Sequence, residues 1–236
     1  MKQTLILKTG STIPVIAEEK GDFEQWIATG MSLSVNQTLS VSVFEGQALP
    51  DLQSISSIVI TGSPAMATEK LDWIEKSQHF ILSAINAGIP VLGICFGHQL
   101  LAQAMGGKVD WHPQGREIGT TLVNRSTESF DDPLFNEMPV TFPVHTTHMQ
   151  TVTELPSDAI ILASNEFESH HAVRFARNVW GVQFHPEFDA AIMRRYIKER
   201  HVQIDDEGLN STALLADVCP TPEALLVLRN FSALAS

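Results

Sequence analysis

The stretch "PVLGICFGHQLLAQAMGG", residues 90–107, decides the fold class. Its first residues, together with Ile89, are apolar throughout, as expected of a parallel strand that is buried on both faces. The residues after Cys95 predict a helix that ends at Gly106 and Gly107. A buried strand that passes directly into a helix is typical of α/β proteins.

The segments before this stretch repeat the alternation of strand and helix. We expect strands at residues 4–7, 38–46 and 55–62, and helices at residues 21–30 and 69–88. The longer helix has apolar residues at helical spacing and Gly88 at its expected C-terminal cap. This order of elements predicts a parallel sheet with helices on both faces.

The second half of the chain is richer in short strands. We expect strands at residues 116–124, 158–164, 170–176 and 178–184, and helices at residues 189–200 and 221–231. Thr221 at the N-cap and Pro222 at the first helical position favour a helix start there. The prediction is a three-layer α/β sandwich with a mostly parallel central sheet plus antiparallel additions. We expect one domain over residues 1–236, with residues 200–236 as a C-terminal helical extension.

Composition and charge limit the possible function classes. The formal net charge of −12 argues against a nucleic-acid partner, which usually needs a basic surface. No apolar segment reaches the roughly 18 residues of a membrane span, and the N-terminus lacks a signal-peptide core. The only cysteines are Cys95 and Cys219, which excludes a disulfide framework and a CxxC zinc pattern. We therefore expect a cytoplasmic protein without membrane or nucleic-acid partners.

Cys95 lies in the pattern Gly93-Ile94-Cys95-Phe96-Gly97, between the predicted strand and the predicted helix. This setting is typical of a nucleophile elbow, in which flanking glycines let the chain turn sharply around the nucleophile. The following helix N-terminus favours a thiolate, and the backbone N–H of Phe96 is left free to bind an oxyanion. The alternative is a buried structural cysteine in a core strand.

A cysteine nucleophile needs a general base, and His185 stands out among the nine histidines. It follows the apolar segment "NVWGVQF" and begins a His-Pro-Glu sequence. In an extended segment His185 and Glu187 project to the same side, so the carboxylate can accept from the imidazole. The alternative is a strand end with two solvated polar residues. His145 and His148 are further candidates for a cleft.

A second backbone donor to an oxyanion is expected from another strand end. The sequence "ITGSP", residues 60–64, ends a predicted parallel strand and brings Gly62 and Ser63 to the sheet edge where Cys95 lies. Gly62 allows an unusual turn, and Ser63 offers its backbone N–H. An ordinary Gly-Ser-Pro turn explains these residues equally well.

Four segments, taken in order, resemble the motifs of the triad-type class I glutamine amidotransferases. They are "VITGSP" (59–64), "PVLGICFGHQLLAQAMGGKV" (90–109), "HTTHMQTVTELP" (145–156) and "WGVQFHPEF" (180–188). Within the family the similarity is greatest to the amidotransferase domain of GMP synthase and its stand-alone relatives. The resemblance implies a flavodoxin-like class I glutamine amidotransferase fold.

The resemblance also implies a mechanism that needs no metal and no cofactor. Cys95 would attack the side-chain amide of glutamine to form a γ-glutamyl thioester, His185 would transfer the proton and release ammonia, and Glu187 would orient His185. The other implied site residues are the oxyanion-hole positions Phe96, Ser63 and Gly62 and the glutamine-binding residues Gln99, Thr147, His148 and Met149.

The chain departs from the family's motifs in three places. Gly62-Ser63-Pro64 replaces Gly-Gly-Pro, and Thr147-His148-Met149-Gln150 replaces Ser-His-Gly-Asp, which puts Met149 near the amino acid end of the substrate. Residues 200–236 match no shared motif and contain no visible ammonia acceptor. A glutaminase of this kind would therefore deliver ammonia to a separate synthase subunit.

Other functions remain open at this point. A stand-alone γ-glutamyl peptidase would use the same thioester on glutathione-like γ-glutamyl compounds and would need no partner. Acyl transfer to homoserine would use a related Cys-His-Glu scaffold, but the "GICFGHQ" match disfavours it. A non-catalytic regulatory module is disfavoured because all the residues of a triad are present.

Overall fold

The computed structural model describes residues 2–235. Within this range the strands of the main sheet are β1 (Gln3–Lys8), β2 (Thr38–Ser42), β3 (Ile55–Ile60), β4 (Val91–Ile94), β6 (Glu117–Arg125), β7 (Thr141–His148), β9 (Ile160–Ser164), β10 (Ala172–Ala176) and β11 (Val179–Val182). The helices are α1 (Pro14–Lys20), α2 (Phe23–Gly30), α3 (Asp72–Asn86), α4 (Phe96–Ala104), α5 (Ala190–Glu199), α6 (His201–Asp206), α7 (Ser211–Asp217) and α8 (Leu226–Leu234). A smaller sheet pairs β5 (Lys108–Trp111) with β8 (Gln150–Glu154).

The main sheet is parallel at one end and antiparallel at the other. In space, the strands of the described residues follow the order β2-β1-β3-β4-β11-β10-β9-β6-β7. The strands from β2 to β11 in this order run parallel, and each later strand pairs antiparallel with its neighbour. The predicted α/β fold, with a central parallel sheet and antiparallel additions, is confirmed.

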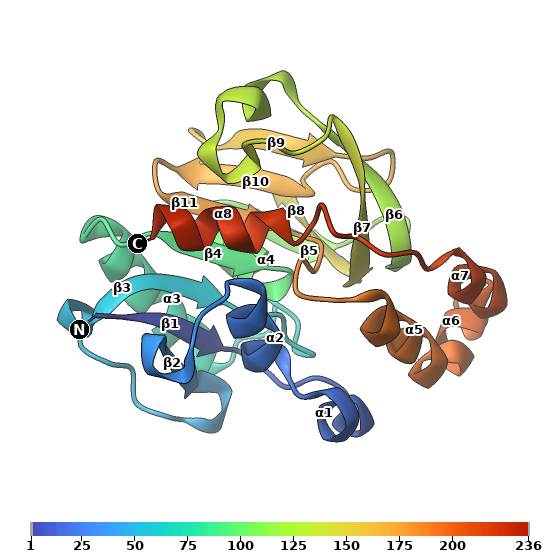
Figure 1. Ribbon diagram of the computed structural model, residues 1–236, viewed down its shortest axis with the longest axis horizontal. Helices are drawn as coiled ribbons and strands as arrows, with labels where there is room; N and C mark the ends of the chain where they lie inside the picture. Colours follow the sequence, from blue (N-terminus) through green and yellow to red (C-terminus); the bar gives the residue numbers. More distant parts are fainter. Residues whose placement is uncertain (1, 236) are drawn as a thin grey trace.

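Two apolar layers lie on opposite faces of this sheet. α3 and α4 bury Ile81 and Leu100 against one face. α2 and α8 bury Ile27 and Leu228 in the other layer, and Figure 1 shows α8 lying over the strands on the near side. The helices thus cover both faces, as the alternation of strands and helices predicts.

The parallel register fixes where the loops after β3, β4 and β11 meet. Ile60 lies beside Gly93 at the ends of β3 and β4, and Val182 lies beside Ile94 on the other side of β4. Ligand sites in α/β folds form at such carboxyl edges of parallel strands. The motif loops that follow these three strands therefore come together at one edge of the sheet.

Two predicted elements differ from the structure by more than three residues at one end. The last helix begins at Leu226 instead of Thr221, because its first turn is tighter than an α-helix, with the Ala224 N–H donating to the Thr221 carbonyl at 3.2 Å. The strand predicted at residues 38–46 ends at Ser42, where a short 3-10 turn begins.

Candidate active site

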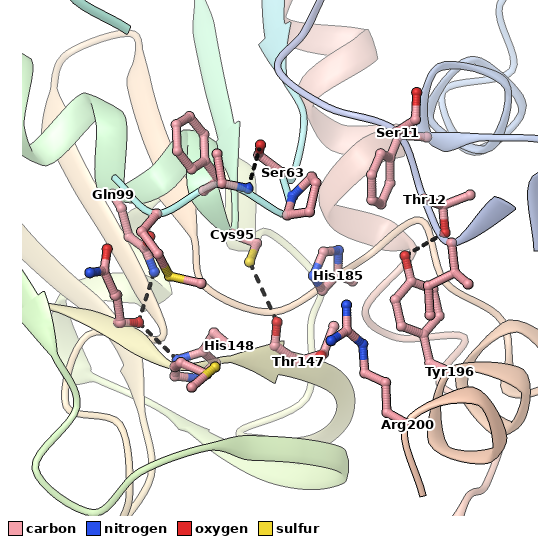
Figure 2. Close-up of a pocket in the computed structure, with 18 of the residues that line it drawn as sticks. Ser11, Thr12, Ser63, Cys95, Gln99, Thr147, His148, His185, Tyr196 and Arg200 are labelled. Atoms are coloured by element: carbon pink, nitrogen blue, oxygen red, sulfur yellow. Dashed lines mark hydrogen bonds between the residues drawn. The ribbon is translucent and has the colours of Figure 1, made fainter. Parts of the chain in front are cut away.

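Cys95 is held in a strained turn between β4 and α4. Its backbone has φ of 52° and ψ of −104°, and a positive φ is seldom adopted by residues other than glycine. The Cys95 N–H donates to the Val182 carbonyl at 2.8 Å, which ties the turn to β11. The sulfur projects into the cavity shown in Figure 2. This conformation matches the predicted nucleophile elbow.

The glycines that flank Cys95 allow the strand and the helix to approach closely. A Cβ on Gly93 would lie 2.4 Å from the Gly97 carbonyl oxygen, and a Cβ on Gly97 would lie 2.5 Å from the Ile60 carbonyl oxygen. Larger residues would therefore clash with the elbow's own backbone and with β3. The crowding that requires glycine thus extends from the elbow to the neighbouring strand.

His185 and Glu187 form a buried pair next to Cys95. The Nδ1–H of His185 donates to Glu187 Oε1 at 2.8 Å. His185 Nε2 is buried and has no hydrogen-bond partner among residues 2–235. The two side chains meet as predicted, although residues 186–187 lie in a turn and not in an extended segment.

The His185 ring is fixed by its neighbours. Phe188 stacks on it with ring centroids 4.2 Å apart and an angle of 18° between the planes, and Phe23 lies nearly parallel to it at 6.3 Å. A Cβ on Gly62 would lie 3.0 Å from His185 Cε1, so the glycine leaves room for the ring. In Figure 2 the imidazole lies beside Cys95.

The electrostatic surroundings of His185 favour its protonated form. Burial lowers the pKa of His185, but attraction to the Glu187 carboxylate and to the Cys95 thiolate raises it, and the net pKa is about 10. At neutral pH the imidazole therefore carries a proton.

The loop after β3 is anchored on the segment after β1. The Ser63 hydroxyl donates to the Thr9 carbonyl at 2.7 Å and accepts from the Ala65 N–H at 3.1 Å. The Thr9 hydroxyl donates to the Gly62 carbonyl at 3.0 Å. Ser63 is not among the residues with positive φ. The serine that replaces a glycine of the motif is therefore accommodated without backbone strain.

A cavity of about 330 Å³ lies over Cys95 (Figure 2). The predicted site residues that line it are Ser63, Cys95, Phe96, Gln99, Thr147, His148, Met149 and His185. Glu187 lies behind His185, and Gly62 packs against the His185 ring. Further lining residues that the motifs did not single out include Thr12, Arg116, Tyr196 and Arg200.

The side chain of Gln99 is held by bonds inside the protein. Its Nε2 donates to the Gln150 carbonyl at 2.7 Å and to Gln183 Oε1 at 3.0 Å. Both amide hydrogens are therefore used, and the Oε1 atom of Gln99 is the group left to accept from a ligand.

His148 belongs to a buried ion pair beneath the pocket. Its Nδ1–H donates to the Gln150 carbonyl at 3.0 Å and its Nε2–H donates to Glu117 Oε2 at 2.9 Å. Burial lowers the pKa of His148, but the hydrogen bond and charge of Glu117 raise it above its ordinary value. Burial raises the pKa of Glu117, but His148 and His171 lower it well below its ordinary range. This pair supports the strand segment that forms the floor of the cavity.

Met149, which replaces a glycine of the family motif, packs against Arg116. Arg116 Nη2 lies 3.1 Å from Met149 Sδ. The same guanidinium binds Glu207 through two bonds, from Nε at 2.7 Å and from Nη2 at 2.8 Å. The methionine is therefore part of a packed cluster at the rim of the cavity.

Comparisons with known proteins place the chain in a family. The family model for glutamine amidotransferase class-I matches residues 23–203, well over half of the chain. The chain belongs to the class I glutamine amidotransferase family. The fold of this amidotransferase is shared along its length with the crystal structure of a glutamine amidotransferase from Thermotoga maritima, with a TM-score of 0.77, 22% identity and coverage of 99% and 97% of the two chains.

The sequence relatives of this amidotransferase include proteins whose names describe two different enzymes. It is 32% identical over 145 residues to gamma-glutamyl peptidase 4 of Arabidopsis thaliana, covering 61% of this chain and 58% of that one. It is 34% identical over 136 residues to a glutamine-hydrolyzing GMP synthase subunit of Methanocaldococcus jannaschii, covering 57% and 66%. The alignments thus span less than two thirds of either relative.

Two further properties of the amidotransferase concern membranes and metals. Among residues 2–235, no helix combines the length and the apolar character needed to cross a lipid bilayer. In the same part of the chain, no group of three or more His, Cys, Asp or Glu side chains has the arrangement of a metal site.

Proposed function

We propose that this amidotransferase hydrolyses the side-chain amide of glutamine through a thioester on Cys95. The observation that carries the proposal is the strained Cys95 turn, which presents the sulfur beside a His185 whose other ring nitrogen is held by Glu187. A nucleophile, a base and an orienting acid in one cavity are the parts that acyl transfer requires. The complete set argues against a non-catalytic regulatory role.

In the first step the Cys95 thiolate attacks the amide carbon, and the carbonyl oxygen becomes an oxyanion. The backbone N–H groups of Phe96, at the N-terminus of α4, and of Ser63, beside Gly62, would bind this charge. His185 gives its Nε2 proton to the amide nitrogen, the C–N bond breaks, and ammonia leaves. The acyl group stays on sulfur as a γ-glutamyl thioester.

In the second step water replaces ammonia. Neutral His185 takes a proton from water as the oxygen attacks the thioester carbon, and the C–S bond breaks to restore the thiolate and the imidazolium. Glu187 stabilises the imidazolium in both steps. The balance is glutamine plus water giving glutamate plus ammonia, with no change of oxidation state.

The reaction has two candidate forms, which differ in the substrate and in the fate of the leaving group. In one, ammonia passes to a separate synthase subunit, in line with the name of the GMP synthase relative. In the other, the same thioester forms from a γ-glutamyl compound such as glutathione, in line with the name of the peptidase relative. Both free cysteines fit a reducing compartment, and we place the reaction in the cytoplasm.

The test is the release of glutamate and ammonia from glutamine, and of glutamate from γ-glutamyl-cysteinyl-glycine, by the purified protein. Cys95→Ser should lower both rates by several orders of magnitude, as expected for a triad nucleophile. Cys219→Ser is the matched control, because Cys219 is also a free cysteine but is exposed. A Cys95→Ser protein that is as active as wild type on both substrates would exclude the thioester. Glutamine turnover that is negligible until a synthase partner is supplied would favour the first form.

A further inference from the structure

The cavity extends to both sides of the proposed reacting atoms. Figure 2 shows Gln99 on one side of Cys95, and His185, Tyr196 and Arg200 on the other. His185 must give its proton to the leaving nitrogen, so the leaving group lies on the His185 side. That side therefore determines which leaving groups fit.

Arg200 brings a positive charge to this side of the cavity. It follows the last turn of α5, four residues after Tyr196, so both side chains lie on the same face of the helix. Figure 2 shows the guanidinium of Arg200 extending toward the space beside His185. Its Nε is buried and has no hydrogen-bond partner among residues 2–235.

The neighbouring acceptors are already occupied. Both carboxylate oxygens of Glu207 bind Arg116, at 2.7 Å and 2.8 Å. The hydroxyl of Tyr196 is hydrogen-bonded to Thr12. Glu199, the preceding residue on α5, pairs with Arg195 at 2.6 Å. Among residues 2–235, Arg200 therefore forms no ion pair, and Glu207 acts on its charge only without direct contact.

A partly buried guanidinium without an ion-pair partner favours an anion in the cavity. Burial and the nearby charge of Arg116 lower the pKa of Arg200, and the charges of Tyr196 and Glu207 offset this only in part. A carboxylate fits the planar guanidinium best, because two parallel N–H···O bonds can form. Ammonia, the leaving group from glutamine, offers no such carboxylate.

Resting on the proposed thioester chemistry, we propose that Arg200 binds a carboxylate of the leaving group. The substrates would then be γ-glutamyl amides of amino acids or peptides, in which the amino group is acylated and the carboxylate is free. During the first step the C–N bond to that amino group breaks, His185 protonates the nitrogen, and the free amino acid or peptide leaves. Arg200 holds its carboxylate throughout and takes no part in proton transfer.

The test compares γ-glutamylglycine with γ-glutamylglycinamide, which differ only in the carboxylate that Arg200 would bind. Wild type should favour the acid in kcat/KM, and Arg200→Gln should reduce the acid-to-amide ratio by about 10- to 100-fold. Arg195→Gln is the matched control, because Arg195 lies on the same helix but pairs with Glu19 and Glu199. It should keep the wild-type ratio. The ratio cancels any general loss of folded protein.

A binding measurement tests the role of Arg200 without relying on turnover. Calorimetry on Cys95→Ser should show tighter binding of γ-glutamylglycine than of γ-glutamylglycinamide, and Arg200→Gln in that background should remove the difference. A wild-type ratio near one, or a ratio unchanged in Arg200→Gln, would overturn the proposal, since Arg200 would then bind the γ-glutamyl group or serve only packing. Cys95→Ser that keeps wild-type hydrolysis would instead refute the thioester, and the acid-to-amide ratio of kcat/KM in Arg200→Gln would still decide the role of Arg200.

Discussion

The buried ion pair between Glu117 and His148 should support both the fold and the floor of the cavity. Glu117 Oε2 accepts from His148 at 2.9 Å and lies 3.3 Å from His171 Nε2, while Oε1 accepts from Asn165 at 2.9 Å. His148 in turn donates to the Gln150 carbonyl at 3.0 Å. Loss of the imidazolium would leave a buried carboxylate beside the cavity and free the backbone that the imidazolium holds.

The expected size of this effect follows from the burial of both groups. We expect His148→Leu to lower the free energy of unfolding by about 3–5 kcal/mol, the usual cost of breaking a buried pair from one side. The double variant Glu117→Gln/His148→Leu should cost less than the sum of the single changes, because no charge is left unpaired. A double-mutant cycle should give a coupling of roughly 0.5–3 kcal/mol.

The same pair makes stability depend on pH. The pKa of Glu117 is lowered in the folded state, so its contribution is present above the ordinary value of 4.5 and is lost as pH falls through the lower folded value. Burial lowers the pKa of His148, but Glu117 chiefly, and also Glu168 and Cys95, raise it above its ordinary value of 6.5. The contribution of His148 to stability is therefore complete below pH 6.5 and is lost as the pH rises through the raised value. The difference in the free energy of unfolding between wild type and the double variant should therefore be largest between pH 4.5 and pH 6.5, and it should decrease in alkali.

Urea unfolding at about pH 5.5 and about pH 8.5, with KM for glutamine measured on the folded variants, tests both parts. The control is Lys108→Gln in the exposed pair with Glu154, whose side chains are 67% and 62% exposed and whose loss should cost no more than about 1 kcal/mol. A His148→Leu cost of about 1 kcal/mol or less, or additive free energies in the cycle, would refute the assignment of a coupled buried charge pair.

Three substitutions test the proposed triad and the glycines that pack beside it. Glu187→Gln should lower kcat by roughly 10²- to 10⁴-fold and, because it removes a charge that raises the pKa of His185, should move the alkaline limb of the kcat–pH profile to lower pH. Gly97→Ala places a Cβ 2.5 Å from the Ile60 carbonyl oxygen and should cost roughly 1–3 kcal/mol in urea unfolding. Gly62→Ala places a Cβ 3.0 Å from His185 Cε1, so it should lower kcat while the free energy of unfolding changes little. A wild-type kcat would contradict the inference that Gly62 leaves room for the His185 ring.

The elbow and the His–Glu pair could be predicted because their requirements are local. Gly93 and Gly97 stand two residues from Cys95, and Glu187 stands two residues from His185, so each unit is complete within a few positions. The parallel register of β3, β4 and β11 then follows from the order of buried strands, and it brings the units together at one sheet edge.

The groups around the reacting atoms could not be predicted because they meet across long separations. Glu117 and His148 are paired positions of the antiparallel β6–β7 ladder, and nothing in either segment specifies that register. Arg116 and Glu207 are 91 residues apart and meet only because α6 ends beside the start of β6. The late start of α8 likewise depends on how the turn before it packs, which Thr221 and Pro222 alone do not determine.

The residues proposed for the chemistry and those proposed for substrate selectivity come from different parts of the fold. The proposed nucleophile, base and oxyanion donors follow the parallel strands, whose geometry the fold fixes. Tyr196 comes from α5, Arg200 caps the C-terminus of that helix, and Glu207 follows α6. The side of the cavity that would receive the leaving group is therefore formed by the C-terminal helices. The family match ends at residue 203, so Glu207 lies outside the matched region. The contact of Glu207 with Arg116, which leaves Arg200 without an ion-pair partner, therefore also depends on residues outside that region. If both proposals hold, changes in this segment would alter the accepted leaving group while the proposed thioester chemistry stays the same.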